Sequence, residues 1–146
     1  MKVVVVGLGY VGLSNAVLLA QHNEVAGVDI SQERVDALNA RKSPIIDAEL
    51  SEYLTEKDLN LSASTDLKAS LTGADYVIVS TPTNYDETTN FFDTSSVETV
   101  IAKVIANEPD LYLLPLCNFH DILDPSSLFI SITFSPIVVA IAISKS

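Results

Sequence analysis

Three glycines near the N-terminus have a spacing that suits the binding of phosphate groups. They form the segment G7-L-G9-Y-V-G12, directly after an apolar run at residues 2–6. Gly7 permits a tight turn, Gly9 lets a pyrophosphate approach the backbone, and Gly12 allows a helix to pack closely on a strand. Backbone N–H groups and the positive end of a helix dipole attract anionic oxygens without any lysine. The pattern predicts a dinucleotide-binding turn.

An acidic residue follows at the spacing that a ribose-binding acid requires. Asp29 lies 22 residues after Gly7, at the end of the next apolar run. Its carboxylate can accept hydrogen bonds from both hydroxyls of an adenosine ribose, and its charge repels the additional phosphate of NADP. NAD is therefore the favoured cofactor. Arg34 leaves an alternative open, because its guanidinium could neutralise a 2′-phosphate, stack beside adenine or lie in solvent.

A second polar segment, S80-T-P-T-N-Y-D-E-T-T-N-F-F, follows a buried apolar run. The carboxyl ends of parallel strands are where open α/β sheets bind ligands. Thr83, Asn84 and Tyr85 could therefore face a nicotinamide or a polar substrate. The alternative is an ordinary polar loop, since loops are usually polar.

The remaining reactive side chains do not form a catalytic or metal-binding cluster. His22 is expected to cap a helix end, and His120 has no partner at metal-ligand spacing. Cys117 has no neighbouring Lys, Arg or helix start that would lower its pKa. We therefore predict no metal site and assign no catalytic residue.

The elements that must position these residues alternate between strands and helices. Ser31 is a suitable N-cap, and Ser95 begins a capping box with Glu98. The alternation predicts an α/β fold in which a Rossmann-like parallel sheet, incomplete in this chain, is flanked by helices over residues 1–107. Strands are expected at residues 2–6, 24–28, 59–63 and 75–80, and helices at residues 13–22, 31–39, 48–55, 66–71 and 95–107.

Residues 108–146 differ in character from the segment before them. They contain neither a helical period nor a clear strand alternation, so we expect an irregular tail of unknown fold. The apolar stretch at residues 128–143 is interrupted by Pro136 and is shorter than the ~20 residues that a membrane helix needs. The length argues against a membrane span.

Composition limits the partners and the compartment. The chain has 146 residues, the length of one ordinary domain, and a formal net charge of -11 with only 8 Lys and Arg. Nucleic-acid binding is excluded because phosphate backbones are held by clustered basic residues. The single cysteine cannot build a disulfide framework, which favours the cytoplasm.

Several longer strings resemble one family. They include MKVVVVGLGYVGLSNAVLLAQHNEV, VDIS, NARKSPIIDAEL and GADYVIVSTPTNYDETTNFFDTSSVETVI, which together cover about residues 1–107. These strings are similar to the NAD-binding domain of UDP-glucose 6-dehydrogenases in the UDP-glucose/GDP-mannose dehydrogenase family. The resemblance implies an NAD-dependent, two-step oxidation of UDP-glucose to UDP-glucuronate for surface polysaccharides. It also implies that a full-length relative could form a homo-oligomer.

The resemblance assigns roles to individual positions. The residues that would bind NAD are Gly7, Gly9, Tyr10, Val11, Gly12, Asp29, Arg34, which is usually a lysine in close relatives, and Thr83. The residues that would border the sugar nucleotide are Thr83, Asn84, Tyr85, Asp86 and Glu87.

The resemblance stops near Asn107. The K-S-T turn, the F-S-P-E-F-L-R-E-G stretch and the catalytic cysteine motif of the family have no counterpart in residues 108–146. We therefore interpret the chain as a truncated or frameshifted product, which we expect to bind NAD weakly at most and to have no turnover. One alternative is a fragment of another nucleotide-sugar dehydrogenase, acting on GDP-mannose or a UDP-N-acetylhexosamine. The other is a non-catalytic nucleotide-binding module that docks through residues 128–143.

Overall fold

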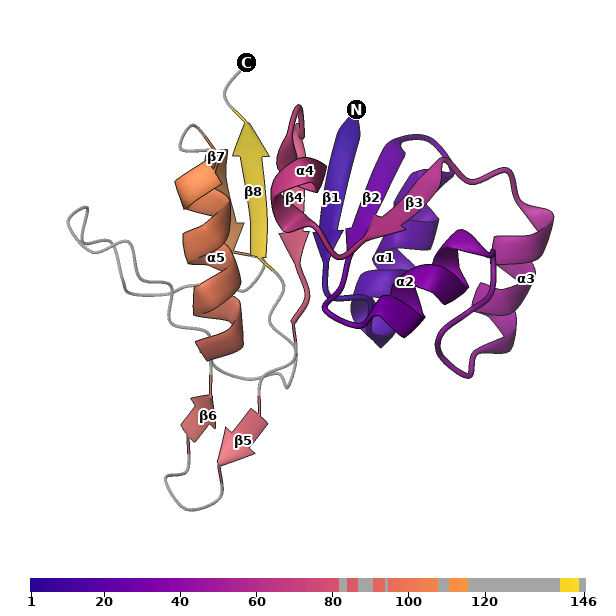
Figure 1. Ribbon diagram of the computed structural model, residues 1–146, viewed down its shortest axis with the longest axis horizontal. Coiled ribbons are helices and arrows are strands. Elements are labelled where there is room, and N and C mark those ends of the chain that lie inside the picture. The colour runs from indigo at the N-terminus through magenta and orange to yellow at the C-terminus, as the bar shows by residue number, and fades with distance from the viewer. Residues whose placement is uncertain (82–83, 87–90, 94, 108–110, 116–139, 145–146) are drawn as a thin grey trace.

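The computed structural model describes residues 1–81, 84–86, 91–93, 95–107, 111–115 and 140–144, and the side chains of residues 1–81 and 95–107. Figure 1 shows a sheet with helices on both faces. The strands are β1 (Lys2–Val6), β2 (Glu24–Val28), β3 (Leu61–Ser64), β4 (Tyr76–Val79), β5 (Asn84–Asp86), β6 (Phe91–Asp93), β7 (Leu111–Pro115) and β8 (Ala140–Ser144). The helices are α1 (Tyr10–Ala20), α2 (Gln32–Asn39), α3 (Ala48–Glu56), α4 (Leu67–Leu71) and α5 (Ser95–Asn107).

The first four strands form the predicted parallel sheet. Their order is β3-β2-β1-β4, so β1 lies in the centre with a parallel neighbour on each side. The register places Val6 of β1 beside Val28 of β2 and Val79 of β4. The three carboxyl ends therefore lie level with one another. The α/β, Rossmann-like fold that the sequence predicts is confirmed.

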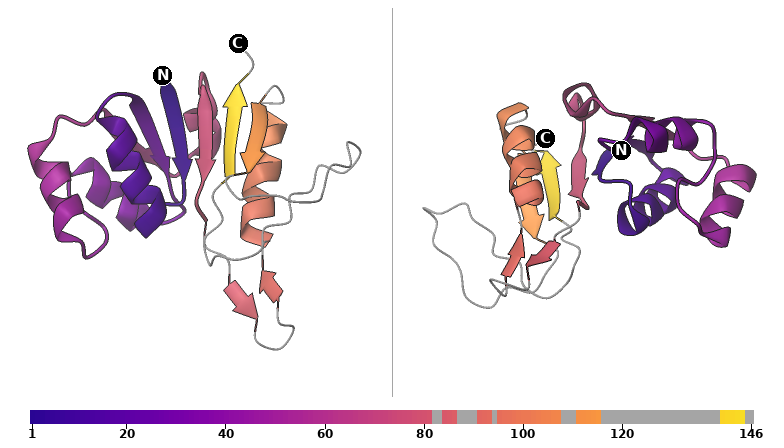
Figure 2. Two further views of the ribbon diagram at one scale, coloured as in Figure 1. Left: turned by 180° about the vertical axis from the view of Figure 1, so that it is seen from behind. Right: turned by 60° about the horizontal axis from the view of Figure 1, so that its bottom comes forward.

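The central strand contributes to two hydrophobic clusters, one on each face of the sheet. Val3 and Val5 pack into one cluster, while Val4 and Val6 pack into the other. Side chains alternate between the faces of a strand, so a continuously apolar strand is buried on both sides. Helices α1 and α2 pack on the first face, with α3 against α1, and α4 and α5 cover the second (Figures 1 and 2).

Most element boundaries agree with the sequence analysis, and α1 differs most. It begins at Tyr10, three residues before the expected start, with Gly12 inside the helix. Glycine is a poor helix former, so the propensity pattern misses the first turn. Strand β3 is shifted by about two residues to Leu61–Ser64. Helix α5 spans Ser95–Asn107 as predicted.

The tail contains two strands that the sequence analysis does not expect. Strand β8 lies between β4 and β7 and is antiparallel to both. An edge strand such as β4 has unpaired backbone groups, which a further strand can satisfy. The alternation of isoleucine and alanine in A-I-A-I-S is hidden within a longer apolar run, which is why the sequence pattern does not reveal it.

The expected polar loop after β4 also contains regular structure. Strands β5 and β6 form a separate two-stranded antiparallel ribbon, which lies beyond the carboxyl ends of the parallel strands (Figure 1). Within the described part of the chain, no helix is long and apolar enough to cross a membrane.

Candidate functional site

The register of the parallel sheet brings three residues to one edge, two of them predicted site residues and the third the first residue of the polar segment. Gly7, Asp29 and Ser80 each directly follow one of the three level strands. The Gly7 N–H donates to the carbonyl oxygen of Val28 at 2.7 Å, and the Ser80 N–H donates to that of Val6 at 2.7 Å. These bonds extend the sheet pairing by one residue and hold the edge together.

Two of the three glycines are required by the packing of the protein itself. Gly7 has a φ of +92°, and a Cβ there would lie 2.6 Å from the carbonyl oxygen of Ser80. A Cβ on Gly12 would collide with the carbonyl group of Gly7. The tight turn and the close contact between helix and strand therefore have the structural causes that the sequence analysis expects.

Gly9 differs, because the space beside it is open. A Cβ there would meet no atom within 4 Å. Gly9 is also the N-cap of α1, provides no side-chain cap, and is followed by no acidic residue in the first turn. The first N–H groups of a helix have no intrahelical acceptor, and they lie at the positive end of the helix dipole. The turn therefore leaves both donors and room for an anionic group.

The two other residues predicted in the turn form the start of α1. Tyr10 is the first residue of the helix and its side chain is exposed, while Val11 is half-buried. Their backbone N–H groups are among those without an intrahelical acceptor. These two residues therefore offer backbone donors, rather than side chains, at the start of α1.

Asp29 is buried at the same edge and held in one orientation. Its Oδ2 accepts a hydrogen bond from the Leu8 N–H at 2.8 Å, and its Oδ1 accepts one from the Ser31 N–H at 2.9 Å. The side chain is only 4% exposed. The carboxylate is therefore fixed beside the glycine turn by backbone donors from two loops.

Arg34 forms an ion pair with Asp29. Its Nη1 lies 3.3 Å from Asp29 Oδ2, and its side chain is 46% exposed. Helix α2 holds Arg34 at this distance, since Ser31 Oγ caps the helix by accepting from the Arg34 N–H at 3.4 Å. The predicted Ser31 cap is confirmed. The sequence analysis considers three arrangements for Arg34, and an ion pair with Asp29 is not one of them.

Two hydroxyl groups that the sequence analysis does not single out also lie at this edge. Ser80 Oγ and Thr81 Oγ1 are buried and have no hydrogen-bond partner in the structure. Ser80 also contacts the turn, because its Cβ lies 3.3 Å from a Cβ built on Gly12. Buried polar atoms are nearly always paired, so these two hydroxyls mark a place where a polar ligand fits. Their position directly after a buried strand is the sequence signal that could have identified them.

The remaining predicted positions are only partly within the described residues. Asn84, Tyr85 and Asp86 form β5. Thr83 and Glu87 lie outside the described residues, as do Cys117 and His120. The structure therefore brings the glycine turn, Asp29 and Arg34 together, and the side chains of residues 83–87 lie outside the part of the chain that it describes.

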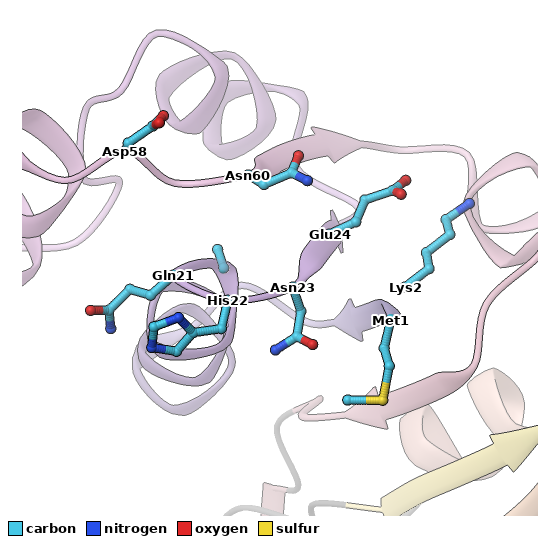
Figure 3. Close-up of a pocket in the computed structure, with 9 residues that line it drawn as sticks. Met1, Lys2, Gln21, His22, Asn23, Glu24, Asp58 and Asn60 are labelled. Carbon is cyan, nitrogen blue, oxygen red and sulfur yellow. The ribbon is translucent and has the colours of Figure 1, made fainter.

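A polar depression at the opposite end of the sheet is a separate feature. Met1, Lys2, His22, Glu24 and Asn60 are among the residues that line it (Figure 3). Asn23, rather than the predicted His22, caps the end of α1, because its Nδ2 donates to the Leu19 carbonyl oxygen at 3.1 Å. Among the described residues, no group of three His, Cys, Asp or Glu side chains could hold a metal ion.

Comparison with known proteins identifies the family of the segment that contains the glycine turn. Residues 1–110 match the model of the UDP-glucose/GDP-mannose dehydrogenase family, NAD binding domain. The chain belongs to the UDP-glucose/GDP-mannose dehydrogenase family. The resemblance that the sequence analysis draws from its motifs is confirmed, and NAD is the cofactor of the domain that it matches.

Relatives within the UDP-glucose/GDP-mannose dehydrogenase family cover the same segment. The chain is 54% identical to a UDP-glucose 6-dehydrogenase of Streptococcus pneumoniae over 101 residues, which are 69% of this chain and 26% of that protein. It is 41% identical to that of Campylobacter jejuni over 106 residues, 71% of this chain and 27% of the relative. The chain thus spans about a quarter of the length of these relatives.

Solved structures of the UDP-glucose/GDP-mannose dehydrogenase family share the fold. A GDP-mannose dehydrogenase from Pseudomonas aeruginosa has a TM-score of 0.66 at 31% identity, covering 73% of this chain and 25% of that one. A UDP-N-acetyl-mannosamine dehydrogenase from Staphylococcus aureus has a TM-score of 0.64 at 32% identity, covering 73% and 26%. The open space at Gly9 and the unpaired hydroxyls at Ser80 and Thr81 fit the NAD that this domain binds in the family.

Proposed function

We propose that this chain holds the NAD for the oxidation of UDP-glucose to UDP-glucuronate, with the remaining steps performed outside the segment that matches the family. The observation that carries the proposal is the meeting of the open Gly9 turn and the buried carboxylate of Asp29 at one sheet edge. An identity of 54% over 101 residues with a UDP-glucose 6-dehydrogenase favours UDP-glucose over GDP-mannose, since a match of similar length, 109 residues, to a GDP-mannose 6-dehydrogenase is 34% identical.

Each group at the edge has a proposed role toward NAD. The N–H groups at the start of α1, including those of Tyr10 and Val11, bind the pyrophosphate. Asp29 accepts hydrogen bonds from the adenosine ribose hydroxyls, and its charge disfavours NADP. Arg34 lies beside Asp29 and contacts the adenosine half of the cofactor. When bound, NAD supplies the acceptor for the hydride.

The polar segment after β4 is proposed to serve both ligands. It follows Ser80 and Thr81, whose backbone lies beside the cofactor turn at Gly7. We assign Thr83 to NAD, and the five residues of the segment to the border of the sugar nucleotide. Those five are Thr83, Asn84, Tyr85, Asp86 and Glu87.

The isolated chain is proposed to bind NAD without turnover. Oxidation of an alcohol to an acid through a covalent thioester requires a cysteine nucleophile and groups that manage protons. The family motifs that supply them have no counterpart in residues 108–146. We further propose a cytoplasmic location, and assembly into a homo-oligomer for a full-length relative.

Titration of the purified chain with NAD and with NADP tests the cofactor assignment. Calorimetry should give tighter binding of NAD, and equal affinity for the two would overturn the role of Asp29. Addition of UDP-glucose with NAD, followed by the absorbance of NADH, tests turnover. Sustained NADH production would contradict the proposal that the chain alone is inactive. Absence of NAD binding would favour a non-catalytic module of another kind.

A further inference from the structure

The number of acceptor sites on Asp29 limits how it can bind a ribose. An ionised carboxylate has two oxygens with about four lone-pair positions in all. Three are used, because Oδ2 accepts from the Leu8 N–H and from Arg34 Nη1, and Oδ1 accepts from the Ser31 N–H. One position remains, whereas two ribose hydroxyls require two. This inference rests on the proposed binding of NAD by Asp29.

The three donors on Asp29 differ in how easily they can leave. The bonds from Leu8 and Ser31 are short, at 2.8 and 2.9 Å, and come from backbone that the sheet edge and the start of α2 hold in place. The contact from Arg34 is longer, at 3.3 Å, and comes from a flexible side chain that is 46% exposed. Half-exposed ion pairs contribute little net stability. Arg34 is therefore the donor that a ligand can displace.

We propose that Arg34 is a displaceable latch on Asp29, which leaves Oδ2 when the adenosine ribose binds and so frees the second acceptor position. In the absence of cofactor, the guanidinium satisfies a carboxylate that is otherwise buried and charged. When the ribose hydroxyls take both free positions, the guanidinium moves into solvent or onto the bound nucleotide. The second hydroxyl thus binds in exchange for the Arg34 contact.

The exchange changes how much one ribose hydroxyl contributes to the affinity for the dinucleotide, and this contribution can be measured. In the wild-type chain, the gain from the second hydroxyl is reduced by the loss of the Arg34 contact. In a variant that lacks the guanidinium, nothing has to be displaced. The loss of affinity on removing that hydroxyl should therefore be larger in the variant.

The experiment measures the affinity of the chain for NAD and for NAD with a 2′-deoxyadenosine moiety by calorimetry. The variants are Arg34→Met, which keeps an unbranched apolar stem without the guanidinium, and Arg34→Gln, which keeps a polar terminus. The ratio of the two affinities should rise about three- to fivefold in both variants, the range expected for an ion pair whose guanidinium is half-exposed to solvent. Lys103→Met removes the same charge from the exposed face of α5 and should leave the ratio unchanged.

The possible outcomes separate this proposal from the one on which it rests. NAD binding with the same affinity ratio in the wild type and both variants overturns the latch and leaves the proposed cofactor site intact. No binding of either dinucleotide by the wild-type chain overturns both proposals. A rise in the ratio for both Arg34 variants and not for Lys103→Met supports the latch.

Discussion

The carbonyl group of Gly7 fills the space that a side chain on Gly12 would need. Gly9, two residues after Gly7, has no such neighbour, since a Cβ there would meet nothing within 4 Å. The first contact is part of the folded protein, and we propose that the open space receives the ligand. The glycines of one motif can therefore be separated by experiment into those that serve the fold and the one that serves the cofactor.

Alanine substitutions should separate these two roles. Gly12→Ala should lower the free energy of unfolding by about 2 kcal/mol or more, because the new methyl group overlaps backbone. Gly9→Ala should change it by less than about 0.5 kcal/mol, since the lost capping preference and the lower entropy of the unfolded chain nearly cancel. Gly9→Ala should, however, weaken NAD binding by about tenfold or more, because the new methyl group lies where the pyrophosphate approaches.

Urea unfolding and NAD titration of each variant provide the two measurements. The wild-type chain is the reference for both. A Gly9→Ala variant that binds NAD as tightly as the wild type would show that the open space is not the phosphate site.

Asp29→Asn should weaken the fold as well as the cofactor preference. An amide has one acceptor oxygen and a donor in place of the other, so either the Leu8 N–H or the Ser31 N–H loses its partner. An unsatisfied buried donor costs about 1–3 kcal/mol, which urea unfolding would measure as reduced stability. Asp36→Asn is the matched control, because Asp36 is exposed on α2 and its Oδ1 accepts from the Gln32 side chain rather than from a buried backbone donor. Equal stability of the two variants would contradict the structural role given to Asp29.

Ser80→Ala should leave the stability of the empty protein unchanged or slightly raised. The hydroxyl is buried without a partner, so its removal relieves a desolvation cost rather than breaking a bond. Ser70→Ala is the matched control, since Ser70 is similarly buried and its Oγ donates to the Asp66 carbonyl oxygen at 2.8 Å. The control should lose about 1 kcal/mol in thermal unfolding. If Ser80→Ala were as destabilising as Ser70→Ala, the Ser80 hydroxyl would have a partner within the protein.

Arg41 combines a left-handed backbone with a side-chain contact. Its φ is +58°, and its Nη2 donates to the Leu59 carbonyl oxygen at 2.7 Å. Arg41→Ala and Arg41→Gly both remove the contact, but only glycine adopts this φ without steric cost. The glycine variant should therefore be more stable than the alanine variant by about 1 kcal/mol. Chemical denaturation of the pair measures the difference, and a more stable alanine variant would refute the expected backbone cost.

Much of the architecture follows from local sequence patterns, for identifiable reasons. Val3 to Val6 form a continuously apolar, β-branched run, which is sufficient to predict a strand buried on both faces. The glycine spacing and the position of Asp29 are set by the geometry of one turn and one strand, so a short stretch of sequence is enough to recognise them.

The contacts that the sequence does not reveal depend on register and on side-chain choice. Ser80 lies against Gly12 only because β1 and β4 pair in one particular register. Arg34 has a long, flexible side chain with several possible partners, and its pairing with Asp29 depends on where α2 begins. The strands β7 and β8 arise from pairing between distant segments, and the alternation in β8 is hidden within a longer apolar run.

The alternation of side chains along β1 joins the two sides of the core into one cooperative unit. Val3 and Val5 belong to the cluster under α1, and Val4 and Val6 to the cluster under α5. Neither layer of helices can separate from the sheet without exposing part of the same five-residue strand. Partial unfolding of one face therefore weakens the other. Because Gly7 follows this strand directly, a ligand held at the turn slows the opening of both layers together and protects their amides from hydrogen exchange.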